Sequence, residues 1–240
     1  MKNTVKFNKR NVKMVAHRGL SGIEAENTVA AFIAAGNRSY WGIETDIHKT
    51  RDGFFVTNHD GNLSRVGGVE MSVKESTLSD LQSVVLLDKD GTTDRADLRI
   101  PTLENYIGIC KKYSKHAVLE IKGEFSEEDI AKVIEIIRGF DYLENVTFIS
   151  FTYSNLKKVR AILPEQSVQF LFSELTDELV ERLIRENISV DARHSALTAE
   201  AIKRFHDAGL TVNCWTVDSP ERAEELTEMG IDQITSNILE

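Results

Sequence analysis

The sequence predicts an α/β protein, a (β/α)8 TIM barrel with a short insertion after its second strand. Short apolar runs alternate with amphipathic segments of helical spacing along most of the chain. Eight such units fit into 240 residues if the run at 54–59 is counted with the second strand. This length is close to the about 250 residues that are typical of the fold. An open, doubly wound sheet is the alternative architecture.

The first half of the chain begins the alternation. Two strands are joined by the turn at 50–53, where Gly53 permits the chain to reverse. A later helix starts after Pro101, and another starts at Ser126 with acidic residues in its first turn. We expect strands at 12–17, 42–49, 54–59 and 117–122, and helices at 27–39, 102–114 and 126–140.

The second half repeats the same unit. We expect strands at 146–151, 167–173, 188–192, 210–217 and 231–235, separated by helices at 154–163, 176–187, 198–209 and 219–230. Only SNILE follows the last strand, so the usual closing helix is expected to be cut short or absent.

Residues 60–100 break this rhythm. The segment is polar, contains several glycines, and is far longer than the about 4–6 residues of a typical connection. We interpret it as an insertion at the catalytic face of the barrel. No linker rich in Pro, Gly or Ser divides the chain, so residues 1–240 are predicted to form one domain.

Composition excludes several classes of protein. The net charge of −9 argues against a general nucleic-acid or anionic-membrane binder. No run approaches the roughly 20 apolar residues of a membrane span, so no stable membrane insertion is expected. The start lacks the apolar region of a signal peptide, which favours the cytoplasm. Cys110 and Cys214 lack metal-type spacing and are expected to be core thiols.

Acidic residues gather where the barrel strands are expected to end. Alternate residues of a strand share a face, so Glu44 and Asp46 point the same way. Glu120 lies on the next predicted barrel strand. Three carboxylates in one pocket repel one another unless a cation neutralises them. Their oxygen ligands suit one divalent cation, either Mg²⁺ or Ca²⁺.

Histidines and cations lie near the same strand ends. His17 and His59 can divide acid and base roles near neutral pH. Arg18 and Lys122 add positive charge suited to a phosphate. Trp215, near a strand end, can cover an apolar edge of a ligand. Four other histidines are interpreted as surface or core residues: His48, His116, His194 and His206.

Short motifs follow one another over nearly the whole chain. They are HRG at 17–19, ENT..AF at 26–32, E.D at 44–46, T.DG..V..HD at 50–60, L.R at 63–65, IPTLEN at 100–105, LEIK at 119–122, SF at 150–151 and WTV at 215–217. In this order the motifs resemble the glycerophosphodiester phosphodiesterase family.

The resemblance implies a function and a role for each candidate residue. It implies cleavage of glycerophosphodiesters to sn-glycerol 3-phosphate and an alcohol, with a small-molecule substrate and a divalent cation. The implied roles are metal ligands for Glu44, Asp46 and Glu120; acid and base for His17 and His59; phosphate contacts for Arg18 and Lys122; a polar support for Asn27; and a glycerol contact for Trp215.

The chain departs from the family pattern at two places. Ala25 stands where a proline is frequent, and Thr235-Ser236-Asn237 stands where the eighth strand often ends in Thr-Asp. The second departure puts a contact from the eighth-strand loop in doubt.

Two other functions compete with glycerophosphodiester cleavage. One is a phospholipase D-like activity on lysophospholipids, and the other is a catalytically inactive binding barrel. No serine, threonine or cysteine in the motif set is an obvious covalent nucleophile. We therefore expect the substrate's own 2-hydroxyl to attack phosphorus and to form a cyclic phosphate.

Overall fold

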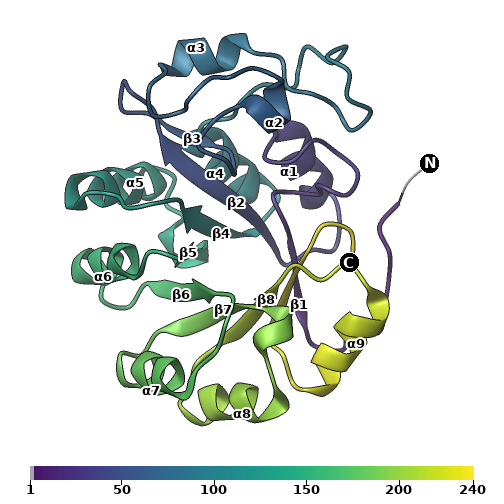
Figure 1. The fold of residues 1–240 in the computed structure, drawn as a ribbon, viewed down its shortest axis with the longest axis vertical. Helices are drawn as coiled ribbons and strands as arrows, with labels where there is room; N and C mark the ends of the chain where they lie inside the picture. The colour runs from purple at the N-terminus through teal and green to yellow at the C-terminus, as the bar shows by residue number, and fades with distance from the viewer. Residues whose placement is uncertain (1–2) are drawn as a thin grey trace.

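The computed structural model describes residues 3–240 and shows a closed barrel of parallel strands surrounded by helices (Figure 1). Pairing between β1 and β2 closes the barrel. The predicted TIM barrel is therefore confirmed, and the open sheet is wrong. The barrel strands are β1 Lys13–Ala16, β2 Gly42–Lys49, β4 His116–Ile121, β5 Val146–Ser150, β6 Ser167–Phe172, β7 Ser189–Arg193, β8 Val212–Trp215 and β9 Gln233–Ser236.

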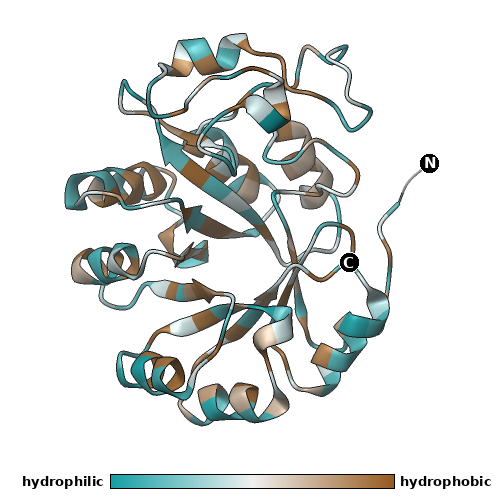
Figure 2. Cartoon of the chain, viewed as in Figure 1, coloured by the Kyte–Doolittle hydropathy of each residue, from teal (hydrophilic) through white to brown (hydrophobic). Residues whose placement is uncertain are grey.

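The outer helices turn their apolar faces toward the strands (Figure 2). Nearly all of them begin at a serine or threonine whose side chain accepts a backbone N–H, a cap worth about 1 kcal/mol each. The helices are α1 Val29–Gly36, α4 Leu103–Lys112, α5 Glu127–Gly139, α6 Tyr153–Ile162, α7 Asp177–Arg185, α8 Ala199–Asp207 and α9 Pro220–Glu228, with short 3₁₀ turns at Leu143–Asn145 and His194–Ala196. None of the helices within residues 3–240 is long and apolar enough to cross a membrane.

Two extended segments cover the barrel where a closing helix would lie. No helix follows β9 in the described chain, as the sequence predicts. Val5 instead forms a parallel bridge with Leu239, whose side chain is fully buried in the main hydrophobic core. The N-terminal segment and the last residues therefore pair with each other along the outside of the barrel.

A hairpin connects the barrel to residues 60–100, the segment expected to be an insertion. β3 (Phe55–Thr57) runs antiparallel to β2 after the turn at Gly53, which has a φ of +89°. Two short helices follow, α2 (Ser64–Gly67) and α3 (Leu78–Ser83). The segment has a hydrophobic cluster of its own, formed by Ala25, Val56, Leu63, Val73, Leu81, Leu86, Leu98 and Ile100.

The inside of the barrel contains both apolar and polar side chains. A small apolar cluster contains Val15 of β1, Val118 of β4, Ile149 of β5 and Leu171 of β6. Buried amide, hydroxyl and carboxyl side chains lie on β6 to β9, at Gln169, Asp191, Asn213, Gln233 and Thr235. Cys110 and Cys214 are fully buried, as expected of core thiols, and burial raises the pKa of Cys110 to about 12.

His116 is a structural residue at the start of β4. Its ring stacks on Trp41 with a centroid distance of 4.2 Å, and its Nε2 lies 2.8 Å from Thr147 Oγ1. Burial, together with the charge of Lys13, lowers the pKa of His116 to about 4. The folded protein therefore disfavours the charged imidazole.

We predict that His116 contributes to acid sensitivity. The unfolded chain binds a proton at this position below about pH 6.5, whereas the folded chain does so only near pH 4. The free energy of unfolding should thus fall as the pH decreases between these values. In urea unfolding at pH 7 and pH 4.5, His116→Gln should lose about 2–3 kcal/mol less than the wild type. Equal losses in both proteins would contradict this assignment.

Candidate active site

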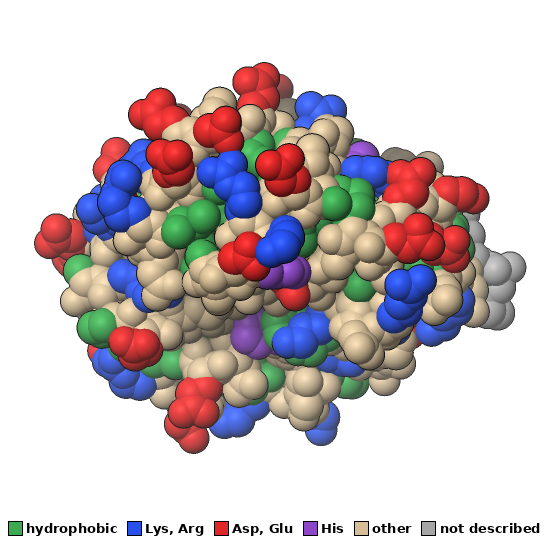
Figure 3. Space-filling model, turned by 90° about the horizontal axis from the view of Figure 1, so that it is seen from below, with side chains coloured by type: hydrophobic (Ala, Val, Ile, Leu, Met, Phe, Trp, Pro, Cys, Tyr) green, Lys and Arg blue, Asp and Glu red, His purple; other side chains and the backbone are tan. Residues whose placement is uncertain are grey.

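A small cavity lies at the C-terminal ends of the barrel strands. Its volume is about 130 Å³, below the ~300–1,000 Å³ of sites for drug-sized ligands. One face of the molecule shows histidine side chains near its centre, among acidic and basic groups (Figure 3). The residues that line the cavity are His17, Arg18, Glu44, His59, Glu120, Ile149, Phe151, Leu171, Asp191, Trp215, Thr216 and Thr235.

Three buried carboxylates form an acidic triad at this cavity. Asp46 on β2 is in register with Glu120 on β4, and Glu44 precedes Asp46 on the same face of β2. One oxygen from each carboxylate lies within 4.8 Å of the others, and none of the three residues is more than 7% exposed. An all-oxygen donor set of this kind suits a hard divalent cation.

The charges around the triad leave it short of positive charge. Burial, with the charge of Asp46, raises the pKa of Glu44 well above its ordinary value and raises that of Glu120 to about 8. Burial would raise the pKa of Asp46 too, but Lys122 and Arg18 outweigh it and lower that pKa. Lys122 Nζ lies 3.0 Å from Glu120 and 3.4 Å from Asp46. The triad therefore fits a divalent cation, which would relieve the remaining repulsion.

Asn27 supports the triad from behind. Its Nδ2 donates to Asp46 Oδ2 at 2.9 Å, and its Oδ1 accepts from the Thr45 hydroxyl at 2.6 Å. Its side chain is 2% exposed. Thr45 points away from Glu44 and Asp46 on β2, so the strand alternation provides both the triad and the group that anchors its support.

The loop after β1 turns sharply to reach the triad. Arg18 has a φ of +54°, and its backbone N–H donates to Glu44 Oε2 at 2.8 Å. Gly19 has a φ of +74°, and a Cβ there would lie 2.7 Å from the backbone of Ala31. A glycine is therefore required for α1 to approach this loop, and the Arg18 guanidinium is left beside Asp46, at 3.6 Å.

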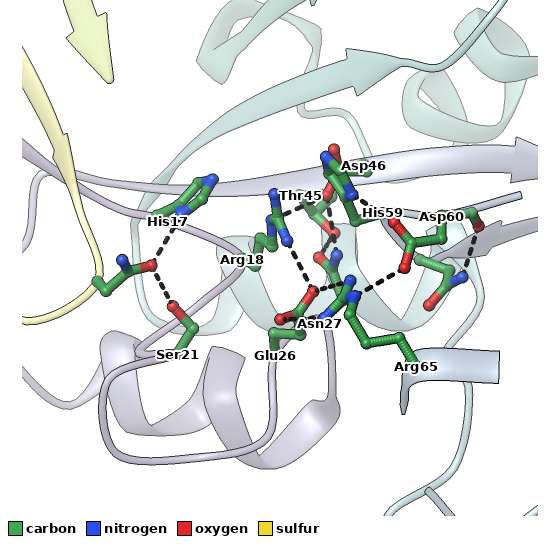
Figure 4. Close-up of polar contacts among 12 residues, drawn as sticks. His17, Arg18, Ser21, Glu26, Asn27, Thr45, Asp46, His59, Asp60 and Arg65 are labelled. Carbon is green, nitrogen blue, oxygen red and sulfur yellow. Dashed lines mark hydrogen bonds and ion pairs between the residues drawn. The ribbon is translucent and has the colours of Figure 1, made fainter. Parts of the chain in front are cut away.

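His17 is held by the loop after β9. Its Nδ1 lies 2.8 Å from Asn237 Oδ1, which also accepts from the Ser21 hydroxyl at 2.7 Å (Figure 4). Asn237 Nδ2 in turn donates to Asp218 at 2.6 Å. An amide oxygen only accepts, so Nδ1 of His17 carries the proton and Nε2 is free to accept one. Burial, with the charge of Arg18, lowers the pKa of His17 to about 4. The eighth-strand loop thus makes a contact of its own through Asn237.

His59 is held by a carboxylate instead. Its Nδ1 lies 2.8 Å from Asp60 Oδ1, and its backbone carbonyl lies 3.1 Å from His48 Nε2. An ionised carboxylate only accepts, so Nδ1 of His59 donates to Asp60, which fixes the orientation of the ring. His48, which the sequence assigned no role, supports the backbone that carries His59.

Trp215 closes the apolar side of the cavity. Its Nε1 donates to the carbonyl of Asp191 at 3.1 Å, and its ring meets Phe151 edge-on with a centroid distance of 5.7 Å. Asp191 also lines the cavity, and burial raises its pKa well above the ordinary value. Its Oδ1 has no hydrogen-bond partner among the described residues.

Several residues of this site were not found by sequence reasoning. Asp191 could have been noticed, because it is a carboxylate inside the apolar run ISVDA. Glu26 and Arg65 belong to the motifs ENT..AF and L.R, and Asn237 to the departure at the eighth strand, but sequence reasoning assigned them no role, because their contacts join distant segments.

Similarity to known proteins places this chain among the enzymes that hydrolyse phosphoric diesters. The chain belongs to the Glycerophosphoryl diester phosphodiesterase family, whose sequence profile matches residues 17–239. The family inferred from the motifs is thereby confirmed.

Three relatives illustrate the similarity. The chain is 29% identical over 230 residues to a glycerophosphodiester phosphodiesterase of Caldanaerobacter subterraneus subsp. tengcongensis, covering 93% of each protein. It is 30% identical over 165 residues to a mouse lysophospholipase D, covering 66% of this chain and 49% of that protein. A phosphodiesterase of Oleispira antarctica, solved in complex with the product sn-glycerol-3-phosphate, has a TM-score of 0.86 at 25% identity, covering 98% of this chain and 96% of that one.

We predict that Glu44→Gln weakens divalent-cation binding while the protein stays folded. The substitution removes one anionic ligand and relieves repulsion with Asp46. Calorimetric titration with Mg²⁺ and with Ca²⁺ should show at least about tenfold weaker binding, the lower end of what even outer-shell changes cost. The melting temperature in the presence of a chelator should not fall. Unchanged affinity for both ions would remove Glu44 from the set of ligands.

Proposed function

We propose that this protein hydrolyses glycerophosphodiesters to sn-glycerol 3-phosphate and an alcohol, using a divalent cation at Glu44, Asp46 and Glu120. One observation carries the proposal: His17 and His59, from different loops, line the same small cavity as two of the triad carboxylates. The product in the Oleispira relative is sn-glycerol-3-phosphate, which supports this substrate class. We also propose that residues 1–240 form one barrel domain, with 60–100 as its insertion.

The cavity can accept the two halves of the product in different ways. Arg18, at the cavity wall, and Lys122, beside the triad, provide positive charge for the phosphate. Trp215, Leu171 and Ile149 provide an apolar surface for the glycerol carbons. The small volume favours a short polyol phosphate over a bulky ligand.

The contacts of the two histidines differ, and we infer different roles from them. His17 has an amide partner and a low pKa, so it is neutral and can accept a proton at Nε2. His59 is held at Nδ1 by the Asp60 carboxylate, which orients the ring and leaves its Nε2 for the substrate. His17 is therefore the general base toward the substrate's 2-hydroxyl, and His59 is the general acid toward the leaving alcohol.

The reaction then proceeds in two steps. His17 removes the proton of the 2-hydroxyl, whose oxygen attacks phosphorus, and His59 protonates the departing alcohol. A cyclic 1,2-phosphate of glycerol forms, and water opens it while the histidines exchange roles. A divalent cation at the triad would neutralise charge that develops on the phosphate oxygens. Asn237 and Asp60 hold the two rings in place through both steps.

Lysophospholipid cleavage is the second candidate. The mouse relative is a lysophospholipase D. Phe151, beside Trp215 at the cavity, is 47% exposed and could contact an acyl chain that stays outside the cavity. An assay with lysophosphatidylcholine separates this activity from cleavage of diesters that carry no acyl chain.

We predict that the purified protein cleaves glycerophosphocholine, -ethanolamine, -glycerol or -inositol, and that a chelator abolishes the activity until Mg²⁺ or Ca²⁺ is added. Release of sn-glycerol 3-phosphate, followed by an enzyme-coupled assay, is the measurement. A 2-deoxyglycerol analogue should be a very poor substrate, because it lacks the attacking hydroxyl. Cleavage of the analogue at the natural rate would instead indicate direct attack by water. No cleavage of any of the four diesters would leave an inactive binding barrel.

We predict that the two histidines respond differently to the leaving group. His17→Ala and His59→Ala should each lower kcat by about 10²–10⁴-fold on glycerophosphocholine. With glycerol 4-nitrophenyl phosphate, the nitrophenolate leaves without a proton, so the loss in His59→Ala should shrink while that in His17→Ala persists. Stopped-flow absorbance at the nitrophenolate band measures both. The reverse pattern would exchange the two roles.

A further inference from the structure

Arg65, on α2, connects Asp60 and Glu26, the carboxylate partners of the cavity residues His59 and Arg18 (Figure 4). Its Nε donates to Asp60 Oδ2 at 2.7 Å, and its two terminal nitrogens donate to the two oxygens of Glu26 at 2.9 Å each. The other oxygen of Asp60 holds His59 at 2.8 Å. Glu26 Oε1 also accepts from Arg18 at 2.8 Å.

The geometry makes this a chain of directed contacts rather than a loose charge cluster. A guanidinium presents its donors in a fixed fork, so three bonds to two carboxylates fix both carboxylates in orientation as well as in position. Asp60 is only partly buried, and without Arg65 its carboxylate could rotate away from the His59 ring. Hydrogen bonds from Arg65 and His59 outweigh the effect of burial and lower the pKa of Asp60, so Asp60 is anionic.

The second arm acts on the phosphate side. Without Arg65, Arg18 would be the single cationic partner of Glu26 among the described residues. The negative charge of Glu26 would then be balanced by Arg18 alone. Arg65 provides a second positive charge to Glu26, so Arg18 keeps more of its own charge for the cavity. Arg18 remains 3.6 Å from Asp46, on the site side of the network.

We propose that Arg65 is a positioning residue for the reaction, which orients the His59 ring through Asp60 and the Arg18 guanidinium through Glu26. The insertion then has a part in catalysis, because its Arg65 links the partner of His59, the general acid, to the partner of Arg18, the phosphate contact. The kinetic consequences of this inference rest on the proposed function, whereas the contacts of Arg65 are independent of it.

Arg65→Met tests the proposal, with Arg95→Met as the matched control. Arg95 belongs to the same insertion and also binds carboxylates, Glu24 at 2.7 Å and Asp97 at 2.9 Å, neither of which contacts His59 or Arg18. Exposed ion pairs add little to stability, so both variants should melt near the wild-type temperature. In Arg65→Met, kcat on glycerophosphocholine should fall about 10- to 100-fold, as for a misplaced catalytic group. KM should rise a few-fold, and Arg95→Met should match the wild type.

Two further measurements separate positioning from a general structural effect. In an Asp60→Asn background, Arg65→Met should lower kcat less than about threefold, because the link to His59 is already broken. Arg65→Lys should recover part of the loss, since one ammonium can hold one carboxylate but not both. Nitrogen NMR of the histidine rings should show His59 protonated at Nδ1 in the wild type and in Arg95→Met, and a mixture of tautomers in Arg65→Met.

The outcomes are distinct. Wild-type kcat and ring spectra in Arg65→Met, or an equal loss in Arg95→Met, would overturn the role of Arg65. If the wild-type protein cleaves none of the four diesters, the proposed function fails, while the ring spectra still decide whether Arg65 orients His59.

Discussion

The rest of the site depends on one electrostatic constraint, the burial of three carboxylates within a few ångströms of each other. Glu44, Asp46 and Glu120 cannot all be charged in a dry pocket without compensation. Two cations, Arg18 and Lys122, compensate part of this negative charge. N–H donors from Asn27 and from the backbone of Arg18 add hydrogen bonds to the carboxylates. These groups satisfy Asp46 best, which is the carboxylate whose pKa is lowered.

The same constraint explains why the two histidines have different partners. His17 lies close to Arg18 in a buried position, where a second positive charge is unfavourable, and its partner is a neutral amide. His59 lies further out, on a partly exposed loop, and its partner is a carboxylate. Asymmetry between the rings thus follows from where each ring lies relative to the fixed positive charges, and an acid–base pair needs such asymmetry.

Sequence reasoning located the barrel and the central residues for clear physical reasons. Period-two alternation on β2 gives the direction of Glu44 and Asp46, and parallel strands bring their C-terminal ends to one edge of the barrel. The contacts of Asn237 and Arg65 could not be predicted in this way. Each joins segments that lie far apart in the chain or within an irregular insertion, where no periodicity indicates direction. Asn237 also stands where the family pattern differs, so the resemblance was least informative there.

The hairpin between β2 and β3 sets the position of His59 relative to the carboxylates of β2. Ile47 pairs with Thr57 across the ladder, and Asn58 donates its N–H to the carbonyl of Asp46 at 3.1 Å. The position of His59 along the strand direction, relative to Asp46, is therefore set by backbone hydrogen bonds between β2 and the segment that carries His59. A slip of two residues in this ladder would keep every side chain on its face but would move the imidazole by about 7 Å. Because the length of a hairpin turn sets the register of its strands, the turn at 50–53 determines the position of His59 although it lies far from the cavity.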